Sequence, residues 1–299
     1  MALNRHNLVR LLLLAVAVVL LAVAAKPSLA PPRTAAEDAA TLKRDLDALL
    51  SGLPGRYGIW YRDLVTGAEV GINQNDSFPA ASCTKVPTVL YLNELVAQGR
   101  MKWTERVTYR ADEDYQEGDG VLRYSAVDGA TYSVRTLANL SITLSDNVAH
   151  RMLLRHLGKE NVAGFMRSLG AKVVYPDGRN VTTPREMGIY MMAVLDFARR
   201  NPEDGNRLLD DLANSIWHVG IPGALPPDLR VSHKEGEITG VANDAGIVFT
   251  DPPYVLVVLS EGVRSPDEGF RAISRISRIV YDYHRGASRG TLTGALPEG

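Results

Sequence analysis

The sequence predicts an α/β (α+β) fold in which an antiparallel sheet flanked by helices is assembled from both ends of the chain, with an all-α subdomain inserted between the two ends. Strand-like runs occur at 57–73 and again after Pro227, whereas the long segment between them has apolar residues at helical spacing. Two separated sets of strands can complete one sheet only if the chain returns to it. We therefore expect a functional site in the cleft between the sheet and the helical subdomain.

The first thirty residues have the pattern of an export signal. Arg5 and Arg10 precede an apolar run from Leu11 to Ala25, which is shorter than the roughly 20 residues of a membrane span. We expect residues 1–30 to be either a cleaved signal peptide or an uncleaved signal anchor in the membrane. The protein is accordingly expected outside the cytoplasm, secreted, periplasmic or anchored to the outer face of the cytoplasmic membrane.

The expected catalytic domain covers residues 34–284. It begins with a helix over 35–50, in which Thr34 and Glu37 have capping-box spacing, followed by a hairpin of two strands. The further expected elements are helices at 84–98, 134–145, 148–157 and 162–169 and from 183 onward, strands at 230–238, 242–250 and 254–260, and a helix from 265 to about 284. We assign 34–83 and 228–284 to the α/β part, 84–227 to the all-α part, and 285–299 to a flexible tail.

Composition excludes several functions. The formal net charge is −1, so a nucleic-acid partner has no electrostatic support. Cys83 is the only cysteine and cannot form a disulfide within the chain. His150 and His156 lie six residues apart without the carboxylates of a zinc site, so we expect no metal and no cofactor. A monomer acting on a small-molecule substrate is expected.

The stretch A-S-C-T-K at 81–85 contains three candidate nucleophiles. On a helix, Ser82 and Lys85 share one face, whereas Cys83 points about 100° away, so we expect Cys83 to be a small buried side chain. A lysine can accept the serine proton only if burial or a nearby cation lowers its pKa. Taken alone, however, a serine at a helix start is usually a cap, and a helical lysine is usually solvated.

Two further stretches, each of which has an ordinary structural interpretation when taken alone, favour a catalytic role for Ser82 and Lys85 when they are taken together with A-S-C-T-K. Ser145-Asp146-Asn147 precedes an apolar helix, where all three residue types are good N-caps. Lys234-Glu235-Gly236 falls on an expected strand, where a glycine lets a ligand or another chain approach the backbone. Lys234 would supply the second cation that a basic Lys85 requires. The three stretches together, in this order, are a much rarer coincidence than any one of them.

In these three stretches the chain resembles the class A β-lactamase family of active-site-serine penicillin-recognising enzymes, whose motifs are S-x-x-K, S-D-N and K-T-G. The likeness extends over about 34–284 and implies an α/β half and an all-α half with the site between them. It also implies that the substrate is a β-lactam or a cell-wall peptide.

The resemblance implies a role for each matching residue. Ser82 would attack the carbonyl, Lys85 would take its proton, and Ser145 would pass a proton to the leaving nitrogen. Asn147 would hold the substrate amide. The remaining roles fall on the expected strand: Lys234 would attract an anionic substrate group, Gly236 would lie against the substrate, and the backbone N–H of Glu237 would complete an oxyanion hole with that of Ser82.

The chain departs from the family pattern at two places. Glu235 stands where the family has a threonine or serine that binds a substrate carboxylate, and it would repel that carboxylate unless it turns away or pairs with Lys234. The family's deacylating glutamate, followed four residues later by asparagine, has no counterpart between Ala171 and Thr182. Asp177 and Asn180 are the nearest substitute, but their spacing is wrong and Pro-Asp-Gly predicts a turn.

Three functions remain open at this stage. The first is hydrolysis of β-lactams through an acyl-Ser82 intermediate. The second is a D,D-peptidase or penicillin-binding protein with slow deacylation, which the missing glutamate favours. The third is an envelope sensor or binding module without turnover. Glu117 and Asp119 lie in a glycine-rich connection, for which we favour a solvated turn over a place at the border of the cleft.

Overall fold

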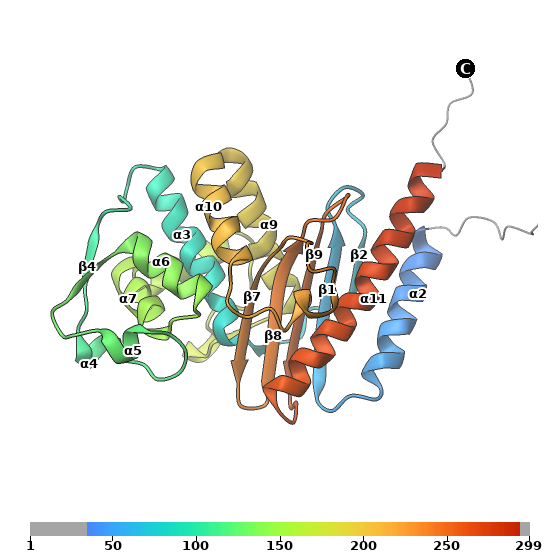
Figure 1. Ribbon diagram of the computed structural model, residues 1–299, viewed down its shortest axis with the longest axis horizontal. Helices are drawn as coiled ribbons and strands as arrows, with labels where there is room; N and C mark the ends of the chain where they lie inside the picture. Colours follow the sequence, from blue (N-terminus) through green and yellow to red (C-terminus); the bar gives the residue numbers. More distant parts are fainter. Residues whose placement is uncertain (1–34, 294–299) are drawn as a thin grey trace, which may run out of the picture. The chain divides into compact units, whose positions relative to one another are not determined.

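The computed structural model describes residues 35–293, and Figure 1 shows how their helices and strands are arranged. The expected export signal, residues 1–30, lies outside the described residues. Among the described residues, no helix combines the length and apolarity needed to cross a membrane.

A five-stranded antiparallel sheet is formed by strands from both ends of the chain. Its order is β2-β1-β9-β8-β7. The strands are β1 (Arg56–Asp63), β2 (Glu69–Ile72), β7 (Val231–Ile238), β8 (Val241–Val248) and β9 (Tyr254–Glu261). β1 pairs with β9 along its whole length, from Arg56 opposite Glu261 to Asp63 opposite Tyr254. Strands β8 and β9 are buried nearly throughout, as expected for central strands covered on both faces.

Two helices from the opposite ends of the chain cover one face of the sheet (Figure 1). They are α2 (Ala35–Leu50) and α11 (Pro266–Thr293). Leu46 of α2 and Ile276 of α11 are fully buried in the core on this face. The helix expected to end near His284 continues to Thr293, which corrects the tail assignment for residues 285–293. The chain has no proline between Pro266 and Pro297 to end that helix earlier.

The helical half packs against the other face of the sheet, chiefly through α9 (Pro184–Arg200). Its further helices and turns are η1 (Ala81–Thr84), α3 (Lys85–Ala97), α4 (Ala111–Asp114), α5 (Leu122–Ser125), α6 (Val134–Thr143), α7 (Asn147–Leu157), α8 (Lys159–Ser168), η2 (Pro176–Gly178) and α10 (Pro202–Ala213). The turn η3 (Ile221–Ala224) packs instead against α11. Two short strand pairs, β3 (Phe78–Pro79) with β6 (Val181–Thr182) and β4 (Arg106–Thr108) with β5 (Thr131–Ser133), join these segments.

Two features of the helical half were not anticipated. Helix α10 begins at Pro202, with only Asn201 between it and α9, and the expected helix from 183 onward was not divided at this proline. The segment carrying Ser82 is a 3-10 turn, η1, and the α-helix begins at Lys85. Both corrections concern helix boundaries and leave the α/β fold class, which the structure confirms, unchanged.

Candidate active site

Ser82 and Lys85 meet where η1 leads into α3. Lys85 donates from Nζ to Ser82 Oγ at 2.9 Å. Lys85 is 2 % exposed, whereas Ser82 is only partly buried and lines the cleft. The preceding residue, Ala81, has φ 46°, a left-handed conformation that is unfavourable for a side chain with a Cβ. The backbone strain therefore lies immediately beside the candidate nucleophile.

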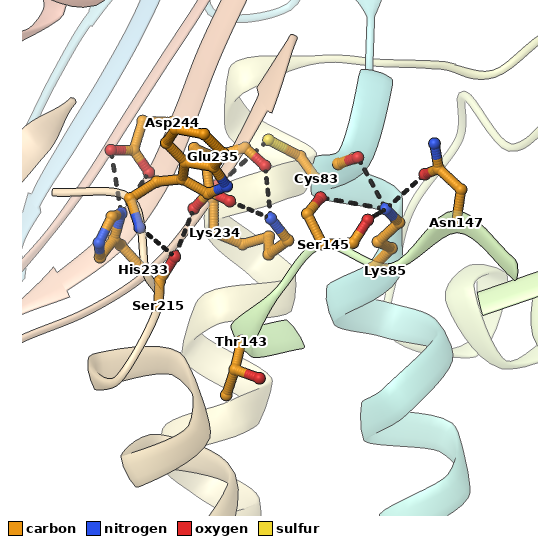
Figure 2. Close-up of polar contacts among 12 residues, drawn as sticks. Cys83, Lys85, Thr143, Ser145, Asn147, Ser215, His233, Lys234, Glu235 and Asp244 are labelled. Atoms are coloured by element: carbon orange, nitrogen blue, oxygen red, sulfur yellow. Dashed lines mark hydrogen bonds and ion pairs between the residues drawn. The ribbon is translucent and has the colours of Figure 1, made fainter. Parts of the chain in front are cut away.

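Ser145, in the connection between α6 and α7, and Asn147, the first residue of α7, both contact the amine of Lys85 (Figure 2). Lys85 Nζ lies 2.5 Å from Ser145 O, 3.1 Å from Ser145 Oγ and 2.7 Å from Asn147 Oδ1. Ser145 has φ 53°. Asp146 fixes this turn, because one of its carboxylate oxygens caps α7 and the other accepts the backbone N–H groups of Val121 and Leu122.

The surroundings of Lys85 bring the pKa of its amine down to about 7. Burial is the largest cause, since it disfavours the charged form, and the positive charge of Lys234 is the second. Asp119, Glu235 and Asp146 act in the opposite direction. An amine with this pKa is substantially unprotonated at neutral pH, so it can accept a proton from the hydroxyl that it contacts.

β7 forms the edge of the sheet that faces η1. A Cβ added at Gly236 would lie 2.7 Å from the backbone nitrogen of Ser82 and 3.1 Å from that of Cys83. Only glycine allows the strand to approach η1 this closely. Glu237, the next residue along, lines the cleft with an exposed side chain.

Lys234 and Glu235 form an ion pair on β7. Lys234 Nζ lies 2.5 Å from Glu235 Oε1, and both residues are buried. Glu235 therefore pairs with Lys234, which is one of the two alternatives expected for it. The second carboxylate oxygen, Oε2, accepts a hydrogen bond from Ser215 Oγ at 3.1 Å.

Cys83 is fully buried, as expected, and its Sγ donates to Lys234 O at 3.3 Å. Burial raises the pKa of the thiol, so Cys83 is not a nucleophile in the folded protein. His150 is half-buried and lines the cleft, and the loss of solvation there, followed by the positive charge of Lys85, lowers its imidazole pKa to about 3. Among residues 35–293, no cluster of histidine, cysteine or acidic side chains could hold a metal ion.

The cleft over these residues has a volume of about 1330 Å³. Glu117 and Asp119 line it, so their connection borders the cleft, and the Glu117 side chain is exposed there as expected of a solvated turn. Asn147 donates to Glu117 O at 2.9 Å and its backbone N–H to Asp119 O at 3.0 Å. Gly118 is the sequence feature that could have indicated this close packing, because a Cβ there would meet the Asn147 side chain at 2.4 Å.

The segment between Ala171 and Thr182 brings Asn180, but not Asp177, of the nearest substitute pair to the cleft. Asp177 is 88 % exposed and its carboxylate lies 3.5 Å from Arg179. Asn180 lines the cleft and donates to Ala81 O at 2.9 Å. Tyr175, which the sequence did not single out, lines the cleft with its hydroxyl 3.1 Å from Thr84 Oγ1.

The comparisons with known proteins agree with this geometry. Residues 41–284 match the family described as "Beta-lactamase enzyme family". The chain is 33 % identical over 238 residues to a β-lactamase of Streptomyces lavendulae, covering 73 % of this chain and 77 % of that protein. It is 32 % identical to β-lactamase L2 of Stenotrophomonas maltophilia, with coverages of 86 % and 89 %. The chain belongs to the β-lactamase family and is a serine hydrolase of the class A type.

Solved structures with the same fold include both β-lactamases and a penicillin-binding protein. The structure of PBP-A superposes with a TM-score of 0.75 at 28 % identity and covers 82 % of this chain and 96 % of its own. An ancestral class A β-lactamase gives a TM-score of 0.73 at 26 % identity, with coverages of 81 % and 99 %. A mutant of PBP-A is known as an acyl-enzyme complex with penicillin G.

Proposed function

We propose that this protein opens the β-lactam ring through an acyl-Ser82 intermediate. The observation that carries the proposal is the 2.9 Å contact between Ser82 Oγ and Lys85 Nζ, made by an amine whose pKa lies at about 7. Unprotonated Lys85 takes the hydroxyl proton while Oγ bonds to the lactam carbonyl carbon. The carbon–nitrogen bond then breaks, and the proton passes from Lys85 through Ser145 Oγ to the leaving nitrogen.

The remaining groups position and stabilise the reacting carbonyl. The backbone N–H groups of Ser82 and Glu237 are the oxyanion donors in this proposal, and one such donor contributes roughly 10²- to 10³-fold in rate. The close approach of β7 to η1 at Gly236 supports this assignment, because it brings the backbone of Glu237 near that of Ser82. Asn147 is the ligand for the substrate amide.

The test is intact-mass spectrometry of the purified protein mixed with benzylpenicillin. We expect a covalent adduct on Ser82, and no adduct in Ser82→Ala. A chromogenic cephalosporin measures turnover in parallel. A folded wild-type protein that forms no adduct and hydrolyses neither compound would contradict the proposal.

A second candidate function is that of a penicillin-binding protein or D,D-peptidase whose acyl-enzyme persists. Asp177 is the sole acid between Ala171 and Thr182, and it is 88 % exposed. Burial raises the pKa of the nearby Tyr175 phenol, so this hydroxyl stays protonated and cannot act as the base for a deacylating water. The similarity to PBP-A supports this candidate.

The lifetime of the adduct separates the two candidates. Decay within the seconds-to-minutes range of a turning-over enzyme favours a β-lactamase, whereas an adduct that outlasts removal of free drug favours the penicillin-binding protein. Parallel incubation with a D-Ala-D-Ala peptide measures the peptidase reaction directly.

Export is part of the same proposal. Arg5, Arg10 and the apolar run at 11–25 support an extracytoplasmic site of action, either as a secreted or periplasmic protein or with an uncleaved membrane anchor. N-terminal sequencing of the protein from its native host distinguishes a cleaved signal from an anchor.

A further inference from the structure

We infer that Glu235 occupies the place of a substrate carboxylate, so that this active site favours acyl donors with no anion beside the reacting carbonyl. The inference rests on the proposed acyl-Ser82 chemistry and adds to it the class of substrate. It starts from the two oxygens of the Glu235 side chain, each of which already has a hydrogen-bond donor from the protein.

The first donor is the buried amine of the same strand. Lys234 Nζ donates to Glu235 Oε1 at 2.5 Å and to the backbone oxygen of Glu235 at 2.9 Å. An ammonium has three donors, and two of them are committed to Glu235. Because the carboxylate also neutralises the charge of Lys234 at contact distance, little attraction remains for a second anion.

The second donor is a hydroxyl from the connection that follows α10. Ser215 Oγ donates to Glu235 Oε2 at 3.1 Å and accepts the backbone N–H of Trp217 at 3.2 Å. Its single hydrogen is therefore used on Glu235. Figure 2 shows the Lys234 ammonium and the Ser215 hydroxyl at the two carboxylate oxygens of Glu235, so neither oxygen lacks a donor.

The walls of the adjoining space are also unsuited to an anion. A small pocket of about 30 Å³ there is lined by Glu235, Asp119 and Glu237 together with the apolar side chains of Trp217, Val219 and Phe270. Partial loss of solvation, and then the negative charges of Asp119, Asp267 and Glu235, raise the pKa of Glu237, so several acids act on one another here. Acidic and apolar walls together fit an uncharged group better than a carboxylate.

The experiment compares benzylpenicillin with its derivative in which the ring carboxylate is converted to the primary carboxamide. The second-order rate of Ser82 acylation is measured for each compound by intact mass. We expect the wild-type protein to react faster with the carboxamide. In Glu235→Thr, the ratio of the carboxylate rate to the carboxamide rate should rise about tenfold or more, which corresponds to about 1.4 kcal/mol.

Glu235→Gln provides a second route to the same result, because it removes the charge and keeps a side chain that can bond to Ser215. Glu203→Gln is the control, since it removes an acid that is 90 % exposed and lines neither pocket. This control should leave the ratio unchanged. Thermal unfolding of each variant verifies that it is folded.

Two results would overturn the inference: a wild-type protein that reacts faster with the carboxylate, or a ratio that stays the same in both Glu235 variants. Either could occur while the Ser82 adduct still forms, so the proposed function would survive. If neither compound forms an adduct with any variant, the acyl-Ser82 proposal itself fails, and the inference fails with it.

Discussion

Lys85 is the residue whose surroundings matter most for the proposed chemistry. Its amine contacts acceptor atoms of Ser82, Ser145 and Asn147. Burial together with the charge of Lys234 brings its pKa to about 7. The sequence indicated two requirements for Lys85 to act as a base, a helix face shared with Ser82 and a second cation nearby. Only the folded chain shows how completely the amine is buried.

The rate of acylation should therefore depend on pH through Lys85. Its unprotonated form is the base, so the rate should rise with pH and level off above an apparent pKa of about 7. Glu235 stabilises the charged form of Lys85, so Glu235→Gln should displace the rise to lower pH. Stopped-flow acylation between pH 5 and 9 measures both curves. A rate independent of pH across this range would exclude Lys85 as the base.

The thiol at Cys83 should be dispensable for reaction. Cys83→Ala should keep the adduct and its rate within about threefold, with a loss in unfolding free energy of roughly 1 kcal/mol for the smaller buried side chain. Ser82→Ala should lose the adduct entirely. Mass spectrometry with benzylpenicillin and urea unfolding give the two readouts. An adduct that disappears in Cys83→Ala but persists in Ser82→Ala would reverse the assignment.

At the scale of elements, the site depends on how closely β7 approaches η1. Gly236 on an expected strand signalled this approach, and a Cβ at this position would lie 2.7 Å from Ser82 N. From the sequence, the pairing of Glu235 with Lys234 was one of two alternatives, the other being that Glu235 turns away from the substrate. Neighbouring residues of a flat strand point to opposite faces, and whether two long side chains curl together depends on the packing around them.

Gly236→Ala should accordingly impair acylation. The added methyl group would have to displace backbone atoms of η1, so we expect a loss of about 10²-fold or more in rate, comparable to removing an oxyanion donor. Gly164→Ala in α8 is the matched control, because its Cβ would meet no atom within 4 Å. It should keep full activity and be more stable by about 0.5–1 kcal/mol. Equal rates in the two variants would show that the close approach is unimportant.

At the scale of the whole molecule, the sequence predicted the antiparallel sheet and the inserted helices because their patterns are long and periodic. It did not separate α10 from α9 at Asn201, and it favoured a solvated turn over a place at the cleft border for the connection containing Glu117 and Asp119. Such a connection has no periodicity, and its place over the cleft depends on bonds to Asn147 from a distant part of the chain.

The helices on the far face of the sheet should affect stability without affecting chemistry. Leu46 of α2 is fully buried against that face, and Leu46→Ala should lower the free energy of unfolding by about 2–5 kcal/mol. Because the site lies on the opposite side, the acylation rate of the folded protein should stay within about twofold of the wild type. Urea unfolding and mass spectrometry measure the two effects. A large drop in the acylation rate would mean that the faces are coupled.

The pairing of β1 with β9 also constrains how the protein can be made. Arg56 and Glu261 are 205 residues apart in the chain yet bonded side by side. During synthesis, the hairpin of β1 and β2 therefore keeps an unpaired edge until β9 has been made, and unpaired strand edges promote aggregation. Prematurely terminated chains should consequently be insoluble rather than partly active, and folding should be slow, as is typical of contacts so distant in sequence.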